Sequence, residues 1–124
     1  MNVVDSSGWL EFFASGTNAS VFAQPIQDVK HLLVPVITLA EVFKRVLQQK
    51  DEPSALQAVG HMMQGQVIPL TGELAIEAGR LGYGMKLPLA DSLILATARR
   101  YNAVLWTQDD DFKSISGVRY VPKR

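Results

Sequence analysis

Apolar residues along the chain fall into short runs that alternate with longer segments of helical periodicity. The short runs are rich in valine, leucine and isoleucine and predict β-strands over residues 2–5, 32–35, 67–70, 103–106 and 118–121. The segments between them carry apolar residues at the spacing of amphipathic helices. Because alternating strands and helices form right-handed crossover units, the pattern predicts a three-layer α/β domain. Its parallel sheet would be covered by helices on both faces.

Capping residues and prolines indicate where the helices begin and end. Helices are expected after Ser6–Gly8, over about 18–29, from Thr38, over 54–64 with Pro53 at its start, from Thr71 to about Leu81, and from near Pro88 to Asn102. Thr38 and Glu41 fit a capping box. The glycines at positions 82 and 84 are expected to end the helix that Thr71 begins. The helix after Pro88 is apolar almost all round, which predicts its burial in the domain centre.

Composition narrows the class of protein. A length of 124 residues predicts a single domain over residues 1–124, and the absence of cysteine excludes disulfides and thiolate metal ligands. Twelve basic and twelve acidic side chains balance, which does not support a basic coat for nucleic acid. The N-terminal MNVVDSSGWLEFF lacks the basic region of a signal peptide, and no apolar run is long enough to span a membrane. We therefore expect a soluble, cytoplasmic protein.

Four acidic residues lie in separate segments that the predicted fold would bring to one edge of the sheet. Asp5 follows the first strand and Asp109 the fourth, while Glu41 and Asp91 lie near the starts of two helices. The carboxyl ends of parallel strands share an edge, where ligands bind. Crowded carboxylates need a cation to offset their repulsion, and oxygen ligands without histidine or thiolate suit Mg²⁺ or Mn²⁺. Such an ion activates water and polarises a phosphoryl oxygen, so the pattern indicates phosphodiester hydrolysis.

Each acid also has a purely structural interpretation. Asp5 could cap the strand-to-helix turn, and Glu41 could serve only the capping box. Asp91 lies in an apolar helix, where it could pair with an arginine or cap the backbone, because an unpaired buried carboxylate is costly. The run Asp109–Asp111 could be a solvated turn. A calcium loop is excluded, because Tyr120 stands where the bidentate glutamate belongs and the loop glycine is missing.

The order and local context of these acids resemble the PIN-domain ribonucleases, particularly the VapC-type toxins of bacterial and archaeal toxin–antitoxin pairs. The matching stretches are VVDSS, TLAEVFKR, LPLADSLILATARRYNAVLWTQDDDF and the final short strand. The third is the most specific, since it holds a helix, a strand and an acidic turn together. The resemblance covers essentially the whole chain. It implies a parallel sheet of order 3-2-1-4-5, with the first and fourth strands side by side.

The resemblance also assigns roles to particular residues. It places the family's four catalytic and metal-binding acids at Asp5, Glu41, Asp91 and Asp109. Glu41 would complete the metal shell or orient the attacking water, and the other three would contact the metal directly or through water. Ser6 and Thr107 would support these acids by hydrogen bonds, with Asp111 as an additional acid.

The activity implied is that of a Mg²⁺- or Mn²⁺-dependent endoribonuclease that forms homodimers and is inhibited by a small antitoxin. Lys44, Arg45 and Lys86 are candidates for contacts with RNA phosphates because they lie near the acids in the sequence. A solvated face is the alternative for these three. The apolar first helix is a candidate surface for an antitoxin or a second copy of the chain.

Two other functions are consistent with parts of the pattern. A PIN-like module could bind RNA or protein without cutting, although the complete set of acids argues against it. A phosphoacceptor receiver domain also gathers aspartates at the carboxyl edge of a parallel sheet. It needs an acidic pair early in the chain and an acceptor aspartate in the middle. Here Asp5 stands alone, and the strand at 67–70 ends without an acid.

Overall fold

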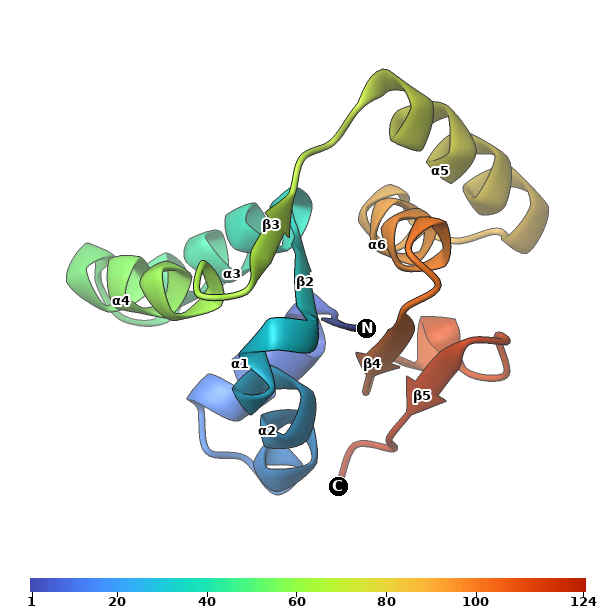
Figure 1. Ribbon diagram of the computed structural model, residues 1–124. Helices are drawn as coiled ribbons and strands as arrows, with labels where there is room; N and C mark the ends of the chain where they lie inside the picture. The colour runs from blue at the N-terminus through green and yellow to red at the C-terminus, as the bar shows by residue number, and fades with distance from the viewer.

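A five-stranded parallel sheet runs through the centre of the molecule (Figure 1). The computed structural model describes residues 1–124. The strands are β1 (Asn2–Val4), β2 (Leu32–Pro35), β3 (Gln66–Ile68), β4 (Val104–Thr107) and β5 (Val118–Tyr120). They follow the order β3-β2-β1-β4-β5, and every neighbouring pair is parallel. The expected fold class and strand order are therefore confirmed.

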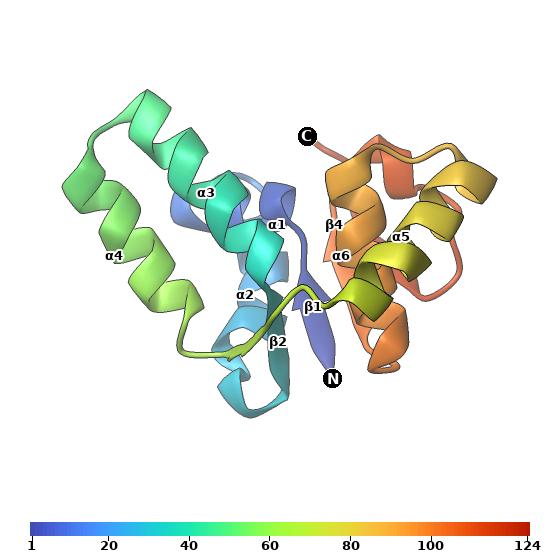
Figure 2. The same cartoon turned by 90° about the horizontal axis from the view of Figure 1, so that it is seen from above.

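Helices cover both faces of this sheet, as Figure 2 shows from above. The α-helices are α1 (Ser6–Phe13), α2 (Ala19–Gln27), α3 (Val36–Gln49), α4 (Glu52–Met62), α5 (Gly72–Met85) and α6 (Leu89–Arg100), with short 3₁₀ turns η1 (Val29–His31) and η2 (Asp110–Phe112). Helices α1 to α4 lie on one side of the sheet, and α5 and α6 lie on the other. No helix combines the length and the apolar character needed to cross a membrane.

The core is divided in two by the alternation of side chains along each strand. Val3, Leu33 and Leu105 pack with α5 and α6, whereas the next residue of each strand packs against α1 to α4. These next residues are Val4, Val34 and Trp106, all buried. Both faces of the central strands are therefore apolar, which is why their sequences read as continuous apolar runs.

Two expected helix boundaries are wrong. Helix α3 begins at Val36, and the Thr38 hydroxyl donates to the carbonyl oxygen of Pro35 at 2.7 Å instead of capping the helix. The capping box is therefore absent, and Glu41 lies in the second turn. Helix α5 does not end before Gly82 but continues to Met85.

The close approach of α5 and α6 explains why α5 keeps a glycine at position 82. A Cβ on Gly82 would lie 2.6 Å from the Ser92 hydroxyl oxygen of α6. The helix ends instead at Lys86, whose φ of 56° places it in the left-handed region. Helix α6 itself is buried from Ser92 to Ala98, which confirms its predicted central position.

Candidate active site

Asp5 lies at the carboxyl end of β1 and is almost completely buried, with 2% of its surface exposed. One carboxylate oxygen, Oδ1, accepts hydrogen bonds from the Ser7 hydroxyl at 2.7 Å and the Gly8 amide at 2.9 Å. The other, Oδ2, accepts from the Thr107 hydroxyl at 2.5 Å. Asp5 is thus the N-cap of α1, as one interpretation of the sequence held, and also the link between β1 and β4.

Burial raises the pKa of Asp5 to about 6, against 3.8 for an ordinary aspartate. The hydrogen bonds from Thr107, Ser7 and Gly8 oppose this rise because they favour the ionised form. The negative charge of Asp109 adds to the rise. A carboxylate in this setting gains stability from a nearby cation.

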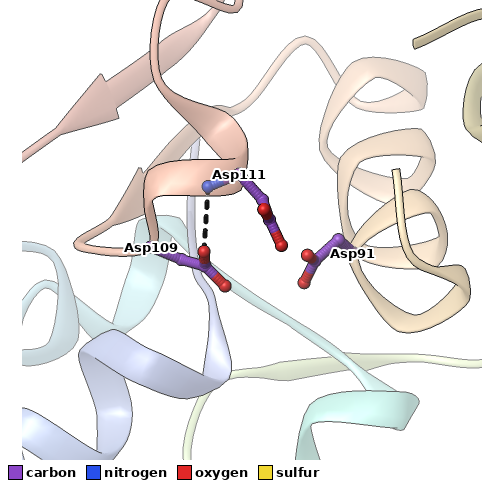
Figure 3. Close-up of side chains that lie close together, drawn as sticks. All are labelled: Asp91, Asp109 and Asp111. Atoms are coloured by element: carbon purple, nitrogen blue, oxygen red, sulfur yellow. Dashed lines mark hydrogen bonds between the residues drawn. The ribbon is translucent and has the colours of Figure 1, made fainter. Parts of the chain in front are cut away.

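Three further carboxylates form an acidic cluster, namely Asp91, Asp109 and Asp111 (Figure 3). One oxygen from each lies within 4.8 Å of the others. Asp91 comes from the first turn of α6, Asp109 follows β4, and Asp111 lies in η2. The Asp109 carboxylate accepts a hydrogen bond from the Asp111 amide at 2.9 Å, which bends the chain so that Asp111 faces Asp91.

Asp91 has no cationic partner, because no salt bridge of the structure includes it. It does not cap α6 either, since no side chain makes a capping hydrogen bond there. Both structural interpretations of Asp91 are therefore wrong. Burial raises its pKa to about 7, and the charges of Asp109 and Asp111 add to the rise. The acidic cluster has the oxygen ligands that Mg²⁺ or Mn²⁺ prefers, so the residues fit such an ion.

Glu41 faces α1 and stands outside the acidic cluster. Its Oε1 accepts a hydrogen bond from the Ser6 hydroxyl at 2.6 Å, which orients the carboxylate. Thr107 connects the remaining parts, since its hydroxyl oxygen accepts from the Asp109 amide at 2.9 Å while the hydroxyl donates to Asp5. Thr107 therefore connects Asp5 with Asp109, and Ser6, the residue after Asp5, connects the start of α1 with Glu41. Their catalytic roles stay predictions.

The basic residues singled out from the sequence are all exposed. Arg45 lines a cavity of about 280 Å³ that also reaches Ser7, and so lies beside the site. Lys44 and Lys86 do not line this cavity. Sequence reasoning missed Ser7, although a hydroxyl two residues after a capping aspartate is a signal that could have found it. It also missed Gln108, which lines the same cavity.

Comparisons with known proteins bear on this arrangement. The family model for the PIN domain matches residues 3–118. A toxin–antitoxin complex from Klebsiella pneumoniae has a TM-score of 0.82 at 23% identity, with 100% of both chains covered. VapC20 from Mycobacterium tuberculosis, described as a sarcin–ricin loop cleaving toxin, has a TM-score of 0.77 at 14% identity, covering 94% of this chain and 95% of that one.

A third structure, VapBC2 from Rickettsia felis bound to a DNA fragment from its promoter, has a TM-score of 0.74 at 16% identity, covering 98% of this chain and 97% of the other. No curated protein sequence matches the chain. At these identities the structural matches show a common fold. The family model spans nearly the whole chain, from β1 to the start of β5. On that match the chain belongs to the PIN domain family.

Proposed function

We propose that this PIN domain is a metal-dependent endoribonuclease and acts as the toxin of a VapBC-type toxin–antitoxin pair. The observation that carries the proposal is the acidic cluster of Asp91, Asp109 and Asp111, which lies beside the buried Asp5 and has no cation to neutralise it. Such a site is costly to keep ionised unless it binds a metal ion. The RNA-cleaving relative VapC20 supports RNA as the substrate. RNA as substrate also suits a cytoplasmic location.

The residues of the site would have different roles in hydrolysis. Asp91 and Asp109 would hold the ion, with Asp5 and Asp111 contributing directly or through water. When bound, Mg²⁺ or Mn²⁺ supplies Lewis acidity toward the scissile phosphate and lowers the pKa of a coordinated water. Glu41, oriented by Ser6, would receive the proton of the attacking water or hold that water in line with the phosphate. Thr107 keeps Asp5 and Asp109 at a fixed separation.

The decisive experiment incubates the purified chain with RNA in Mg²⁺, in Mn²⁺ and in EDTA, and follows cleavage on a gel. Cleavage is expected with either metal, and none in EDTA or in the variant Asp5→Asn. A duplex DNA of matched length serves as the substrate control. The competing function is a PIN-like module that binds RNA or protein without cutting. If the wild type is inactive in both metals while Asp5→Asn binds RNA equally well, the nuclease proposal is lost.

We also propose a small antitoxin protein as the partner and a homodimer as the assembly. Support for the antitoxin comes from the neighbouring structures, which include toxin–antitoxin complexes. An apolar groove of about 310 Å³ between α1, α3 and α4 offers a surface for it, lined by Leu10, Phe13, Val46, Ala58 and His61 among others. Light scattering measures the mass of the isolated chain. Induced expression, alone and with the neighbouring gene, tests toxicity and its relief.

A further inference from the structure

A second cavity lies beside Asp5, and none of the clustered acids lines it. We call it the side cavity; it has a volume of about 280 Å³, and its polar lining comprises Ser7, Glu11, Arg45, Gln49, Gln108 and Lys123. Ser7 belongs to both regions, since its hydroxyl also donates to Asp5. An RNA strand whose scissile phosphate lies at the acids could therefore continue into the side cavity.

Gln108 lies in the wall of this cavity, and 8% of its surface is exposed. Asn18 determines how its amide is oriented, because the Asn18 Nδ2 donates to the Gln108 Oε1 at 3.0 Å. The same Nδ2 donates to the carbonyl oxygen of Pro122 at 3.0 Å, which ties the C-terminal segment to the start of α2. The amide nitrogen of Gln108 keeps its two N–H groups without an acceptor in the protein. The fully buried side-chain atoms without a hydrogen-bond partner are Trp9 Nε1 and Asn18 Oδ1, so the Gln108 amide nitrogen is reached by solvent from the cavity and is free to donate to a ligand there.

The charge of the side cavity is the opposite of that of the acids beside it. Arg45 and Lys123 line it, and neither forms a salt bridge. Glu11 is the one acid in its lining, and the Glu11 carboxylate already accepts a hydrogen bond from the backbone amide of Asn18 at 2.9 Å. Two cations against one carboxylate leave the cavity with a net positive charge. An anionic group is therefore favoured in the side cavity, whereas the neighbouring carboxylates would repel it.

We propose that the side cavity binds the nucleotide adjacent to the scissile phosphate of a single-stranded RNA. Arg45 and Lys123 hold the phosphate of that nucleotide, and the Gln108 amide donates to an acceptor on its base. The volume is near the lower end for small-molecule sites, which fits one unpaired nucleotide and no duplex. Single-stranded RNA exposes base edges to such donors. This inference rests on the proposed nuclease function and adds a subsite that selects the substrate.

The proposed roles of Arg45 and Lys123 are tested by measuring RNA binding in the absence of metal. Fluorescence anisotropy in EDTA measures the affinity of the full chain for a labelled, random-sequence octaribonucleotide. The double variant Arg45→Gln/Lys123→Gln is expected to weaken binding by about tenfold or more. Because Arg45 and Lys123 hold one phosphate, the slope of log K against log salt should also fall by about 0.7. The matched control Lys30→Gln/Arg80→Gln removes the same charge from exposed positions outside the side cavity, and its affinity should change less than about twofold.

Gln108 is tested by a variant that keeps the contact with Asn18. Gln108→Glu retains an acceptor for the Asn18 side-chain amide but replaces the free donor with a charged acceptor, so RNA binding should weaken. Because the added charge would itself repel RNA, Gln108→Met, which removes the donor without adding a charge, is measured beside it and should weaken binding as well. In the wild type, the side-chain amide resonances of Gln108 should shift when the octaribonucleotide is added. Separate titrations with oligo(U), oligo(C) and oligo(A) measure which base the subsite prefers.

The outcomes separate this inference from the nuclease proposal. If the chain cleaves RNA but the Arg45/Lys123 double variant binds like its control, the subsite is wrong and the nuclease stands. If the subsite binds RNA as described while the wild type never cleaves, catalysis is the part that fails. If a protein partner shifts the Gln108 amide and the octaribonucleotide does not, the side cavity is a protein-binding site and the inference is overturned.

Discussion

Replacing Asp91 by asparagine is expected to stabilise the metal-free protein while abolishing cleavage. In the folded chain, burial and the charges of Asp109 and Asp111 raise the pKa of Asp91 from 3.8 to about 7. An ionised Asp91 therefore destabilises the folded state at pH 8, and an asparagine of the same shape removes that cost. Cleavage should be lost because a neutral amide is a poor ligand for a divalent cation.

The size of the effect follows from the pKa. For a fully buried group, a rise in pKa from 3.8 to about 7 means that ionisation lowers the free energy of unfolding by about 4 kcal/mol. Asp91 is half-buried, and solvent screening reduces this to roughly 1–2 kcal/mol. For a domain of this size, that gain raises the melting temperature by roughly 3–8 °C. The sign follows from linkage: between pH 4 and 7 the folded state binds more protons than the unfolded state, so the cost grows as pH rises. The gain at pH 5 should be less than about half that at pH 8.

Thermal unfolding in EDTA at both pH values measures this difference. Asp110→Asn is the matched control, because Asp110 lies in the same turn but outside the acidic cluster and is exposed. Adding Mg²⁺ should raise the melting temperature of the wild type by more than that of Asp91→Asn, since a ligand stabilises only the state that binds it. A lower melting temperature of Asp91→Asn at pH 8 in EDTA would show that the carboxylate has a structural role, and the electrostatic reasoning would be wrong.

Three other changes test separate parts of the molecule. Ser6→Ala removes the hydrogen bond to Glu41, so the cleavage rate should fall about tenfold while RNA affinity in EDTA stays unchanged; an equal loss of affinity would contradict an orienting role. Gly82→Ala places a Cβ 2.6 Å from the Ser92 hydroxyl and should cost about 1–3 kcal/mol in urea unfolding, whereas an unchanged midpoint would mean that α5 and α6 separate freely. The pKa of Asp5 rises from 3.8 to about 6 on folding, so its ionisation should lower the free energy of unfolding of the metal-free protein by about 3 kcal/mol as pH rises from 4 to 7. In denaturant titrations, the free energy of unfolding of Asp5→Asn should not show this fall between pH 4 and 7.

The sequence predicts the layers of this fold better than their details. Apolar runs alternating with helical segments are sufficient for a parallel α/β domain, because both faces of β1, β2 and β4 are covered. Alternation does not determine the order of the strands, which came from the resemblance to a family. The helix boundaries failed where packing overrides local signals. Gly82 reads as a helix end but lies within α5, because α6 leaves no room there for a Cβ.

The sequence predicts that the acids converge at one edge of the sheet, but not which carboxylates lie closest together. Asp5, Glu41, Asp91 and Asp109 could be located from their positions after strands and near helix starts. Asp111 looked secondary, and only the turn that Asp109 makes with its amide brings it against Asp91. Gln108 gave no signal at all. Its burial depends on Asn18, which lies 90 positions away in the chain.

The hydrogen bond between Thr107 and Asp5 joins residues 102 positions apart. During synthesis β1 leaves the ribosome early, yet its neighbour β4 and the acidic cluster emerge much later. Until then Asp5 has neither Thr107 nor Asp109 beside it, so the nascent chain carries an incomplete set of acids. A nuclease built this way gains activity only near the completion of the domain. Prematurely terminated fragments that lack β4 would be inert toward the RNA of the cell that makes them.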